Sequence, residues 1–496
     1  MNHFRLDRLH SWGGVSFLAG VAMLVCFAWM ARLPGLRGPA TTSFLAAFLL
    51  VSIAYAIAAL RLNRDHLPIT LIWGFAIVFR LIMLSTTPTL SDDVFRYIWD
   101  GHLLNQGVNP YALHVESPLL DPYDTPLRAL INNSWMASPY LPSSQLLFAF
   151  VARLVPQSFV VFQAAAIFFD VLTGLLIMDI LKMLNLPRNR VLIYLWNPLI
   201  VIEFSHSAHI DALMLFFIML SFWFLVRSRP GKRNESYQKS ASVVSLAAAT
   251  LTKALPGLLL PLFVRRWGIW RILFCAVLLV VPIAVFASGA GWGISGPLDG
   301  SGVFGALRIY ARYWNYNSSI YHWLEVLVTG HGTPGAVPLE VAGEGIINLL
   351  KNILTITIGL IAVGTGIWSW FLDDPSKRDH DTRNIYLLRL ALIPLGAYLL
   401  LTHTVHPWYV TLVIPFVPFL LPRMGEKPLT ARFAVPWLYL SCAVALSYLT
   451  YLDPGDLREF YLVRWLEYIP FYILLFWAAW PYLGQVLTSI LDSDTR

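Results

Sequence analysis

Two adjacent carboxylates, Asp92 and Asp93 in the run SDDVFRYIWDGHLLNQGVNPY, are the residues of this chain best suited to chemistry. A carboxylate within hydrogen-bond reach of a hydroxyl group can act as a general base. If the run is helical, the polar residues at helical spacing after Asp93 share its face; these are Arg96, Tyr97 and Asp100. The opposite face is apolar, so we predict an amphipathic helix in a membrane interface, with its apolar side in lipid and its carboxylates in water.

The same helix also has a purely structural interpretation. Asp92–Arg96 and Arg96–Asp100 ion pairs on a solvated face would stabilise it by only about 0.2–0.5 kcal/mol each. We favour the functional interpretation, because carboxylates beside an acyl boundary are costly to keep. Further polar clusters also occur on the same predicted side of the membrane.

A second cluster contains residue types that ligate metals: His206, His209 and Asp211, in the run FSHSAHIDAL. Its His-x-x-His-x-Asp spacing is loose and no fourth ligand is evident. A helix-capping aspartate beside interfacial histidines is the alternative. We predict that these residues shape a pocket, and we expect neither a metal site nor a cofactor.

Cations form the next part of the pattern. Arg308 and Arg312 project together if their segment is helical, and a pair of guanidinium groups suits a phosphate. Both could instead be interfacial anchors among aromatic side chains. Lys253 lies at the turn of a predicted hairpin, where its charge at membrane depth requires an anionic partner.

The remaining candidates are polar or aromatic residues of the outer segments: Asn109, Tyr111, Trp314, Asn315, Asn317, His403, His406, Trp408 and Tyr409. With the other clusters they predict an outward pocket that has carboxylates on one wall and cations on another. Such a pocket suits sugar transfer from a lipid phosphate. Cations would hold the leaving phosphate, a carboxylate would take the proton of the acceptor, and aromatic side chains would surround the oxocarbenium-like sugar.

Composition indicates which elements position these residues. Hydrophobic residues make up 57% of the chain and charged residues 13%, against about 25% charged residues in soluble proteins. Apolar runs of about 20 residues recur, each long enough to cross the ~30 Å of bilayer hydrocarbon. We therefore predict an all-α polytopic membrane protein of about 12–14 transmembrane helices. One integral domain would cover residues 1–496, with C-terminal spans over 384–487.

Two long outer loops, 87–157 and 289–345, are predicted to carry interfacial helices, and 143–155 is too short to span a bilayer. Most of the 35 Lys and Arg residues fall on one predicted side of the membrane, as the positive-inside rule expects. These cytoplasmic segments are 1–11, 61–67, 182–190, 227–239, 265–271, 372–389, 423–432 and the tail. The net charge of +7 is thus a topology signal, and no nucleic-acid-binding stripe accompanies it.

The Asp92–Asp93 pair in the first outer loop resembles the acidic signature of the C-type glycosyltransferase (GT-C) superfamily. Four segments, in order over roughly 70–420, resemble its bacterial polyprenyl-phosphate-mannose-dependent mannosyltransferase-like branch. They are the aspartates followed by Arg96-Tyr97, Trp99-Asp100-Gly101 and Gly107-x-Asn109-Pro110-Tyr111; Trp196-Asn197-Pro198 before His209-x-Asp211-Ala212; Tyr313-Trp314-x-Tyr316-Asn317-x-Ser319; and His406-Pro407-Trp408-Tyr409. One departure is the run SPYLP at 138–142, where relatives tend to carry Tyr-Pro-Pro.

The resemblance implies an inverting, metal-independent transfer of a hexose such as mannose. The donor would be a polyprenyl-phosphate-linked sugar and the acceptor a glycan or glycolipid, outside the cytoplasmic (inner) membrane. We predict Asp93 as the base, because it shares a face with Arg96 and Tyr97, and Asp92 as its substitute. A transporter or flippase of a lipid-linked sugar is the alternative, but it should place charges through the depth of the spans. A structural membrane subunit fits poorly with so many outer polar residues.

Overall fold

The computed structural model describes residues 14–62, 64–65, 67–294, 300–330, 344–423, 426, 429–453 and 458–493. Within these residues the chain is helical and has no strand; one isolated bridge pairs Tyr316 with Thr404. The predicted cytoplasmic segment 1–11 and parts of the loop 289–345 lie outside the described residues. The all-α class predicted from composition is confirmed.

The helices are α2 (Gly14–Met30), η1 (Gly38–Ala40), α3 (Thr41–Arg61), α4 (Ile69–Leu84), α5 (Asp93–Asn105), η2 (Pro118–Tyr123), η3 (Arg128–Leu130), α6 (Pro142–Leu154), α7 (Phe159–Met183), η4 (Arg188–Val191), α8 (Leu192–Leu195), α9 (Pro198–Val201), η5 (Ile202–His206), α10 (Asp211–Arg227), α11 (Glu235–Thr252), η6 (Leu255–Leu259), α12 (Leu260–Trp267), α13 (Ile269–Ala290), α14 (Gly305–Tyr313), α15 (Ile320–Thr329), α16 (Glu344–Leu372), α17 (His380–Leu401), η7 (Pro407–Phe419), η8 (Thr430–Phe433), α18 (Ala434–Ala443), η9 (Val444–Tyr451) and α19 (Tyr461–Ser493).

Seven helices in the described part of the chain are long and apolar enough to cross a membrane. They are Gly38–Arg61, Phe159–Met183, Ile269–Ala290, Gly345–Leu372, His380–Leu401, Thr430–Tyr451 and Tyr461–Tyr482. Shorter apolar helices include α2, α4 and η7. The protein is therefore a multi-pass membrane protein, and a total of 12–14 spans stays a prediction.

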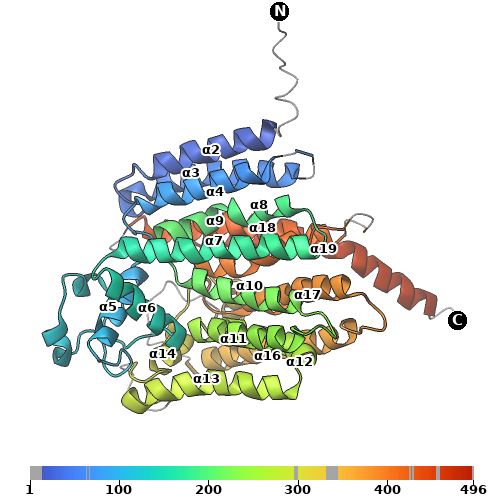
Figure 1. Ribbon diagram of the computed structural model, residues 1–496. Coiled ribbons are helices and arrows are strands. Elements are labelled where there is room, and N and C mark those ends of the chain that lie inside the picture. The colour runs from blue at the N-terminus through green and yellow to red at the C-terminus, as the bar shows by residue number, and fades with distance from the viewer. Residues whose placement is uncertain are drawn as a thin grey trace, which may run out of the picture.

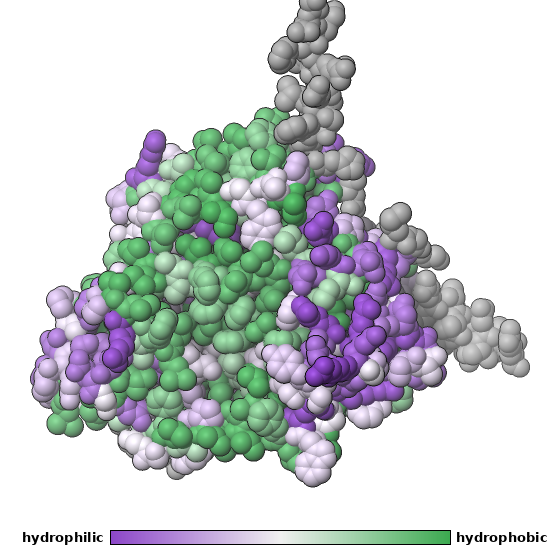
Figure 2. All heavy atoms as spheres, viewed as in Figure 1, coloured by the Kyte–Doolittle hydropathy of each residue, from purple (hydrophilic) through white to green (hydrophobic). Residues whose placement is uncertain are grey.

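The long helices lie side by side along one common direction, with α2, α3 and α4 at one edge of the bundle and α13 at the other (Figure 1). Figure 2 shows an apolar band across the middle of the molecule and polar residues toward both ends. Large apolar side chains of the candidate spans are exposed, among them Val277 of α13 and Leu360 of α16. Lipid tails would cover such a surface without cost, whereas water would not.

A buried ion pair ties three helices together inside the bundle. Arg80 of α4 donates from Nε to Asp170 of α7, and neither side chain has any exposed surface. Its Nη1 donates to the carbonyl of Leu195 at 2.9 Å, and Tyr194 donates its hydroxyl to the other Asp170 oxygen at 2.7 Å. Each charge is thus neutralised and hydrogen-bonded where water cannot reach it.

We expect Asp170→Asn to destabilise the protein by about 3–5 kcal/mol, because it leaves the Arg80 cation buried without a counter-charge. Thermal unfolding of the purified protein in detergent should show the loss as a lower Tm. The double variant Arg80→Met with Asp170→Leu should recover most of it, since no charge is left uncompensated. A single variant that melts like the wild type would contradict this role.

The first outer loop contains two short helices that pack against each other, α5 and α6. The helix predicted within the run 91–111 is present as Asp93–Asn105, and the short helix predicted at 143–155 is present as Pro142–Leu154. Gly101 makes the close approach possible, because a Cβ at this position would overlap the carbonyl group of Phe148. Helix α5 begins directly at Asp93, whose backbone N–H donates to the hydroxyl of Ser91 at 3.2 Å. A carboxylate in the first helical turn is favoured by the helix dipole.

The expected solvation of the polar face of α5 is wrong. Arg96, Tyr97 and Asp100 are all buried, because the loop that leads to α6 folds over them. The Arg96–Asp100 ion pair does form, with Nε 2.9 Å from Oδ1, but inside the protein. The Asp92–Arg96 pair does not form, since Arg96 Nη2 donates to the carbonyl of Met136 and Asp92 contacts Arg37 at 3.2 Å.

Several chain segments meet at the end of the bundle that carries α5 and α6 (Figure 1). The predicted hairpin at 240–264 is present: α11 ends at Thr252, Lys253 is extended, and η6 begins at Leu255. Pro407 occupies the first turn of η7, as expected for the start of a helix. These turns bring residues that are far apart in sequence to one place.

Candidate active site

Asp93, Glu203 and Asp211 form a cluster of carboxyl groups, the Asp93 cluster, at the end of the bundle that carries α5 and α6. Asp93 is its partly exposed member. Its side chain is 21% exposed, and its Oδ2 lies 3.8 Å from Nδ1 of His209. Burial raises the pKa of the Asp93 carboxyl, Lys253 opposes the increase, and hydrogen bonds from Tyr140 and Asn132 also oppose it. A carboxylate with a raised pKa is a better proton acceptor than an ordinary one.

His209 joins Asp93 to a second carboxyl group. Its Nε2 lies 3.3 Å from Oε2 of Glu203, and both side chains are fully buried. Glu203 belongs to η5, a single π-helical turn, and its Oε1 accepts the hydroxyl of Tyr448 at 2.6 Å. The turn to α10 passes through Ala208 at a positive φ of 58°, which is strained for a residue with a Cβ. Such turns and strain often occur at functional sites.

Lys253 has the anionic partner that its position required. Its Nζ lies 2.6 Å from Oδ2 of Asp211, with the lysine 17% and the aspartate 1% exposed. The ammonium group also lies 5.3 Å from the centre of the Tyr409 ring, a distance at which a cation is attracted to an aromatic face. The N-cap position of α10 is occupied by Ile210, and Asp211 follows in the first turn, where its carboxylate is paired with Lys253.

Four aromatic rings form a continuous stack beside these charges. His209 stacks on Trp408 with ring centres 4.0 Å apart, Trp408 stacks on His406 at 4.5 Å, and His406 stacks on Tyr316 at 4.7 Å. Burial and, to a smaller extent, the Lys253 cation lower the pKa of His406 to about 3. His406 is therefore neutral at physiological pH, which suits a site that excludes water.

The other candidate residues of the first outer loop hold α5, which carries Asp93, in place. Asp100 accepts bonds from Ser138 and Gln145 in addition to Arg96. The Tyr97 ring stacks on Phe148 at 4.5 Å. These groups fix α5 against α6, and thereby fix where Asp93 lies.

Asn109 and Tyr111 connect the loop to its surroundings. Asn109 donates from Nδ2 to the carbonyl of Phe286 in α13 at 2.8 Å. Tyr111 is fully buried and donates to the carbonyl of Tyr140, whose side chain reaches Asp93. The departure from the relatives at 138–142 thus falls on residues that hold Asp93.

Arg308 and Arg312 lie on one helix, α14, as predicted. Arg308 donates to the carbonyl of Ile294 at 3.1 Å, and the Arg312 guanidinium lies 5.2 Å from the Tyr313 ring centre. The same helix carries Tyr310, whose hydroxyl lies 2.8 Å from that of Tyr409. Because Tyr409 also contacts Lys253, α14 adjoins the Lys253 side of the cluster.

Asn317 belongs to a neighbouring buried network. Its Nδ2 donates to Glu467 at 2.7 Å, and its backbone N–H donates to Glu459 at 3.1 Å. Asn315 donates to Glu325, and His403 contacts the carbonyl of Trp314. Asn317 connects to the aromatic stack through the adjacent Tyr316.

Both ring nitrogens of His206 are engaged by the segment that follows α4. Its Nδ1 lies 2.7 Å from the Thr86 hydroxyl, and its Nε2 accepts the N–H of Thr89 at 3.1 Å. His209 and Asp211 face other partners, and the described residues contain no group of three side chains arranged to hold a metal ion.

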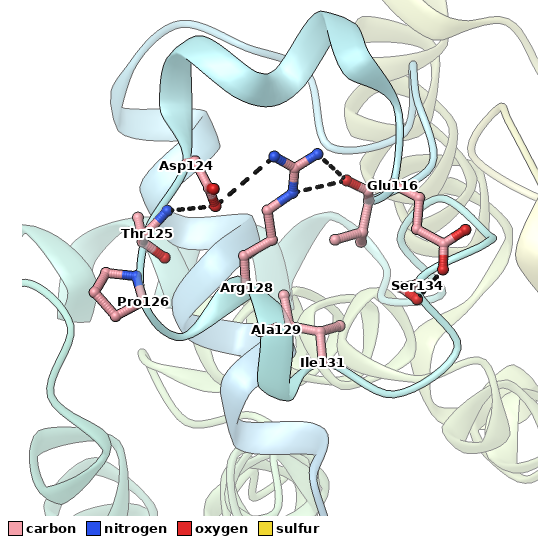
Figure 3. Close-up of a pocket in the computed structure, with 9 residues that line it drawn as sticks. Glu116, Asp124, Thr125, Pro126, Arg128, Ala129, Ile131 and Ser134 are labelled. Atoms are coloured by element: carbon pink, nitrogen blue, oxygen red, sulfur yellow. Dashed lines mark hydrogen bonds and ion pairs between the residues drawn. The ribbon is translucent and has the colours of Figure 1, made fainter.

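A hollow of about 740 Å³ opens on the surface of the first outer loop (Figure 3). Arg128 lies at its centre and bonds to the carbonyl of Val115 and to Asp124. The hollow is lined by Val115, Glu116, Asp124, Thr125, Pro126, Arg128, Ala129, Ile131 and Ser134. None of its lining residues belongs to the Asp93 cluster, but Asn132, which follows the lining residue Ile131 in the sequence, lowers the pKa of Asp93 through a hydrogen bond.

Sequence reasoning missed Glu203, Tyr140 and Tyr448. A signal was present for Glu203, which is a lone carboxyl group in the apolar run PLIVIEF; such residues in membrane segments are costly and often functional. Tyr140 lies in the run SPYLP, which the sequence marked only as a departure from the relatives, and nothing in the sequence marked Tyr448, because its role depends on a contact with a distant residue.

A family model described as alpha-(1->6)-mannopyranosyltransferase, N-terminal domain, matches residues 9–269, just over half of the chain. The match includes Asp93, Glu203, His209 and Lys253. The rings contributed by Trp408, His406 and Tyr316 lie beyond it. No curated protein and no solved structure matches the sequence.

Proposed function

Because the chain belongs to the alpha-(1→6)-mannopyranosyltransferase family, we propose that it moves mannose from a polyprenyl-phosphate donor to a glycan or glycolipid acceptor. Its class as a multi-pass membrane mannosyltransferase follows from the family and the apolar helices. The donor, the acceptor and the residue roles below are our proposal. The observation that carries it is the partly exposed Asp93, which lies 3.8 Å from His209 of the aromatic stack and is acted on by the charge of the ion-paired Lys253.

In the proposed reaction Asp93 is the base. The acceptor hydroxyl gives its proton to Asp93 as its oxygen attacks C1 of the donor sugar. The bond between C1 and the phosphate oxygen breaks, and polyprenyl phosphate leaves from the opposite face, so the configuration at C1 inverts. The rings of His209, Trp408 and His406 keep this centre dry, which strengthens the electrostatic interactions within it.

Cations receive the phosphate in this proposal. Lys253 supplies a point charge near Asp93, and Arg308 and Arg312 supply forked donors from α14. The acceptor would approach from the aqueous side across the hollow, whose wall at Ile131 and Ser134 flanks Asn132. A site at the outer surface of the cytoplasmic membrane agrees with the distribution of basic residues.

A flippase remains the alternative of a different class. Its substrate path would require charged groups along the depth of the bundle. Inside the bundle, Arg80 and Asp170 neutralise each other and have no exposed surface, which favours chemistry at one end of the bundle. Purified protein in liposomes should therefore transfer mannose from polyprenyl-phosphate mannose to an acceptor. Translocation of the lipid without any glycosidic product would contradict the proposal.

Replacing Arg308 or Arg312 with alanine should raise the KM for the lipid donor about tenfold or more, and the KM for the acceptor much less, since each arginine would bind phosphate through charge-assisted bonds. Arg271→Ala is the matched control, because Arg271 contacts Ser236 and Ser240 away from this site. Unchanged donor KM in both arginine variants would identify them as interfacial anchors.

Treatment with a strong chelator should leave transfer intact, and added magnesium, manganese or zinc should raise it little. Side-chain cations can balance the leaving phosphate, so a divalent ion is not required. Turnover measured before and after chelation tests this. A loss that one specific ion reverses, and that is absent in His209→Ala, would show that the histidines bind a metal.

A further inference from the structure

Glu203 is a buried carboxyl group that the proposed reaction does not yet use. It has no exposed surface, and its Oε1 accepts the Tyr448 hydroxyl. Its Oε2 lies 3.3 Å from Nε2 of His209, and both atoms are buried without a recorded hydrogen-bond partner. The backbone adds a fixed connection, since the N–H of His209 donates to the carbonyl of Glu203 at 3.0 Å. His209 thus lies between two carboxyl groups, one enclosed and one accessible.

The two carboxyl groups bear on which ring nitrogen of His209 carries the proton. A neutral imidazole donates from one nitrogen and accepts at the other. An ionised Asp93 can only accept, so a proton on Nδ1, which lies 3.8 Å from Oδ2 of Asp93, is the favourable arrangement. Nε2 is then an acceptor, and the group that faces it must be a donor. Glu203 meets this requirement only as a neutral carboxylic acid.

The surroundings of Glu203 favour the neutral acid. An isolated carboxylate without water costs several kcal/mol, and the Lys253 ammonium forms its ion pair with Asp211, not with Glu203. The Tyr448 hydroxyl satisfies Oε1, which leaves Oε2 to carry the proton toward His209. Stacking on Trp408 keeps the imidazole plane in place.

We propose that Glu203 is a positioning residue: as a neutral acid it donates to Nε2 of His209 and holds the tautomer whose Nδ1–H faces the ionised Asp93. The proposal rests on the proposed function, because it assigns Glu203 a role in keeping the base ionised. Other titratable groups also act on Asp93, His209 or Glu203 or are acted on by them. They are Asp92, Tyr97, Tyr140, His206, Asp211, Lys253, Tyr310, His406, Tyr448 and Tyr451. They stay unchanged in Glu203 variants, so a difference in pH profile reports on Glu203.

The test compares an apolar and an amide replacement. Glu203→Leu removes the donor to Nε2, and without an oriented N–H the pKa of Asp93 should rise further. The acid limb of the kcat/KM profile should then move to higher pH by about one unit, with kcat lowered about tenfold and the donor KM nearly constant.

In Glu203→Gln the amide oxygen can accept from Tyr448 and the amide N–H can donate to Nε2. This variant should keep the wild-type acid limb and most of the turnover.

Glu467→Leu controls for the loss of a buried carboxyl group elsewhere, and its acid limb should not move. His209→Asn supplies an amide donor to Asp93 that needs no acid behind it, so adding Glu203→Leu to it should have no further effect. If the Glu203→Leu protein does not insert into the membrane, Glu203→Gln and His209→Asn still test the proposal, because both variants should keep the acid limb of the wild-type pH profile. An unmoved acid limb in Glu203→Leu, or equal impairment in Glu203→Gln, would overturn the proposal. An enzyme that transfers no mannose at all would instead contradict the proposed function.

Discussion

Asp93→Asn should lower kcat for mannose transfer by about 10²–10⁴-fold, the usual contribution of a general base. An amide cannot take the proton of the acceptor hydroxyl, although it fills the same space at the start of α5. Initial rates with polyprenyl-phosphate mannose, measured on purified protein in liposomes, check this result. Donor binding should change little, because the cations that would hold the phosphate remain.

Asp92→Asn is the matched control, since Asp92 contacts Arg37 and lies beside Asp93 rather than against His209. It should lose much less activity. A dead Asp92→Asn with a nearly normal Asp93→Asn would exchange the two roles. Full activity in both variants would exclude an aspartate base at this position.

The second large effect is expected at Lys253. Lys253→Met should lower kcat/KM for the donor by about 10²–10³-fold, as for other removals of a preorganised charge from a dry site. The substitution removes a cation that acts on Asp93 and also leaves the almost fully buried Asp211 side chain without its ion-pair partner. Donor-dependent rates at constant acceptor concentration give the measurement.

Two variants separate these two causes. Lys253→Arg keeps the charge and should keep most donor use, whereas Asp211→Asn removes the partner and leaves the cation. If Lys253→Met uses the donor normally and only melts at lower temperature, Lys253 serves Asp211 and not the phosphate.

Successive spans cross the membrane in opposite directions, so the order of the apolar runs predicts which loops lie on the same side. This explains which parts of the site could be predicted from the sequence. Lys253 and Asp211 are 42 residues apart, yet counting apolar runs was enough to predict that both lie at the same end of the bundle. The helix at Asp93 and the start of η7 at Pro407 followed from local rules for helices.

Burial could not be predicted in the same way. The polar face of α5 was expected in water, because its spacing gives no information about Ser138 and Gln145, which lie 38 and 45 residues from Asp100. The role of Glu203 depends on Tyr448, 245 residues further along the chain. Such long-range pairs follow from how helices pack, and periodicity does not encode them.

The aromatic stack has a consequence for the biogenesis of the protein. His209 and Glu203 are synthesised and inserted well before Trp408, His406 and Tyr448, which complete their surroundings. Until the last helices arrive, the nascent chain holds carboxyl groups in the membrane without their final partners, and insertion of those helices relieves this cost. Chains truncated before residue 400 would keep every acidic residue of the site and still be incomplete, which makes them natural targets for membrane quality control.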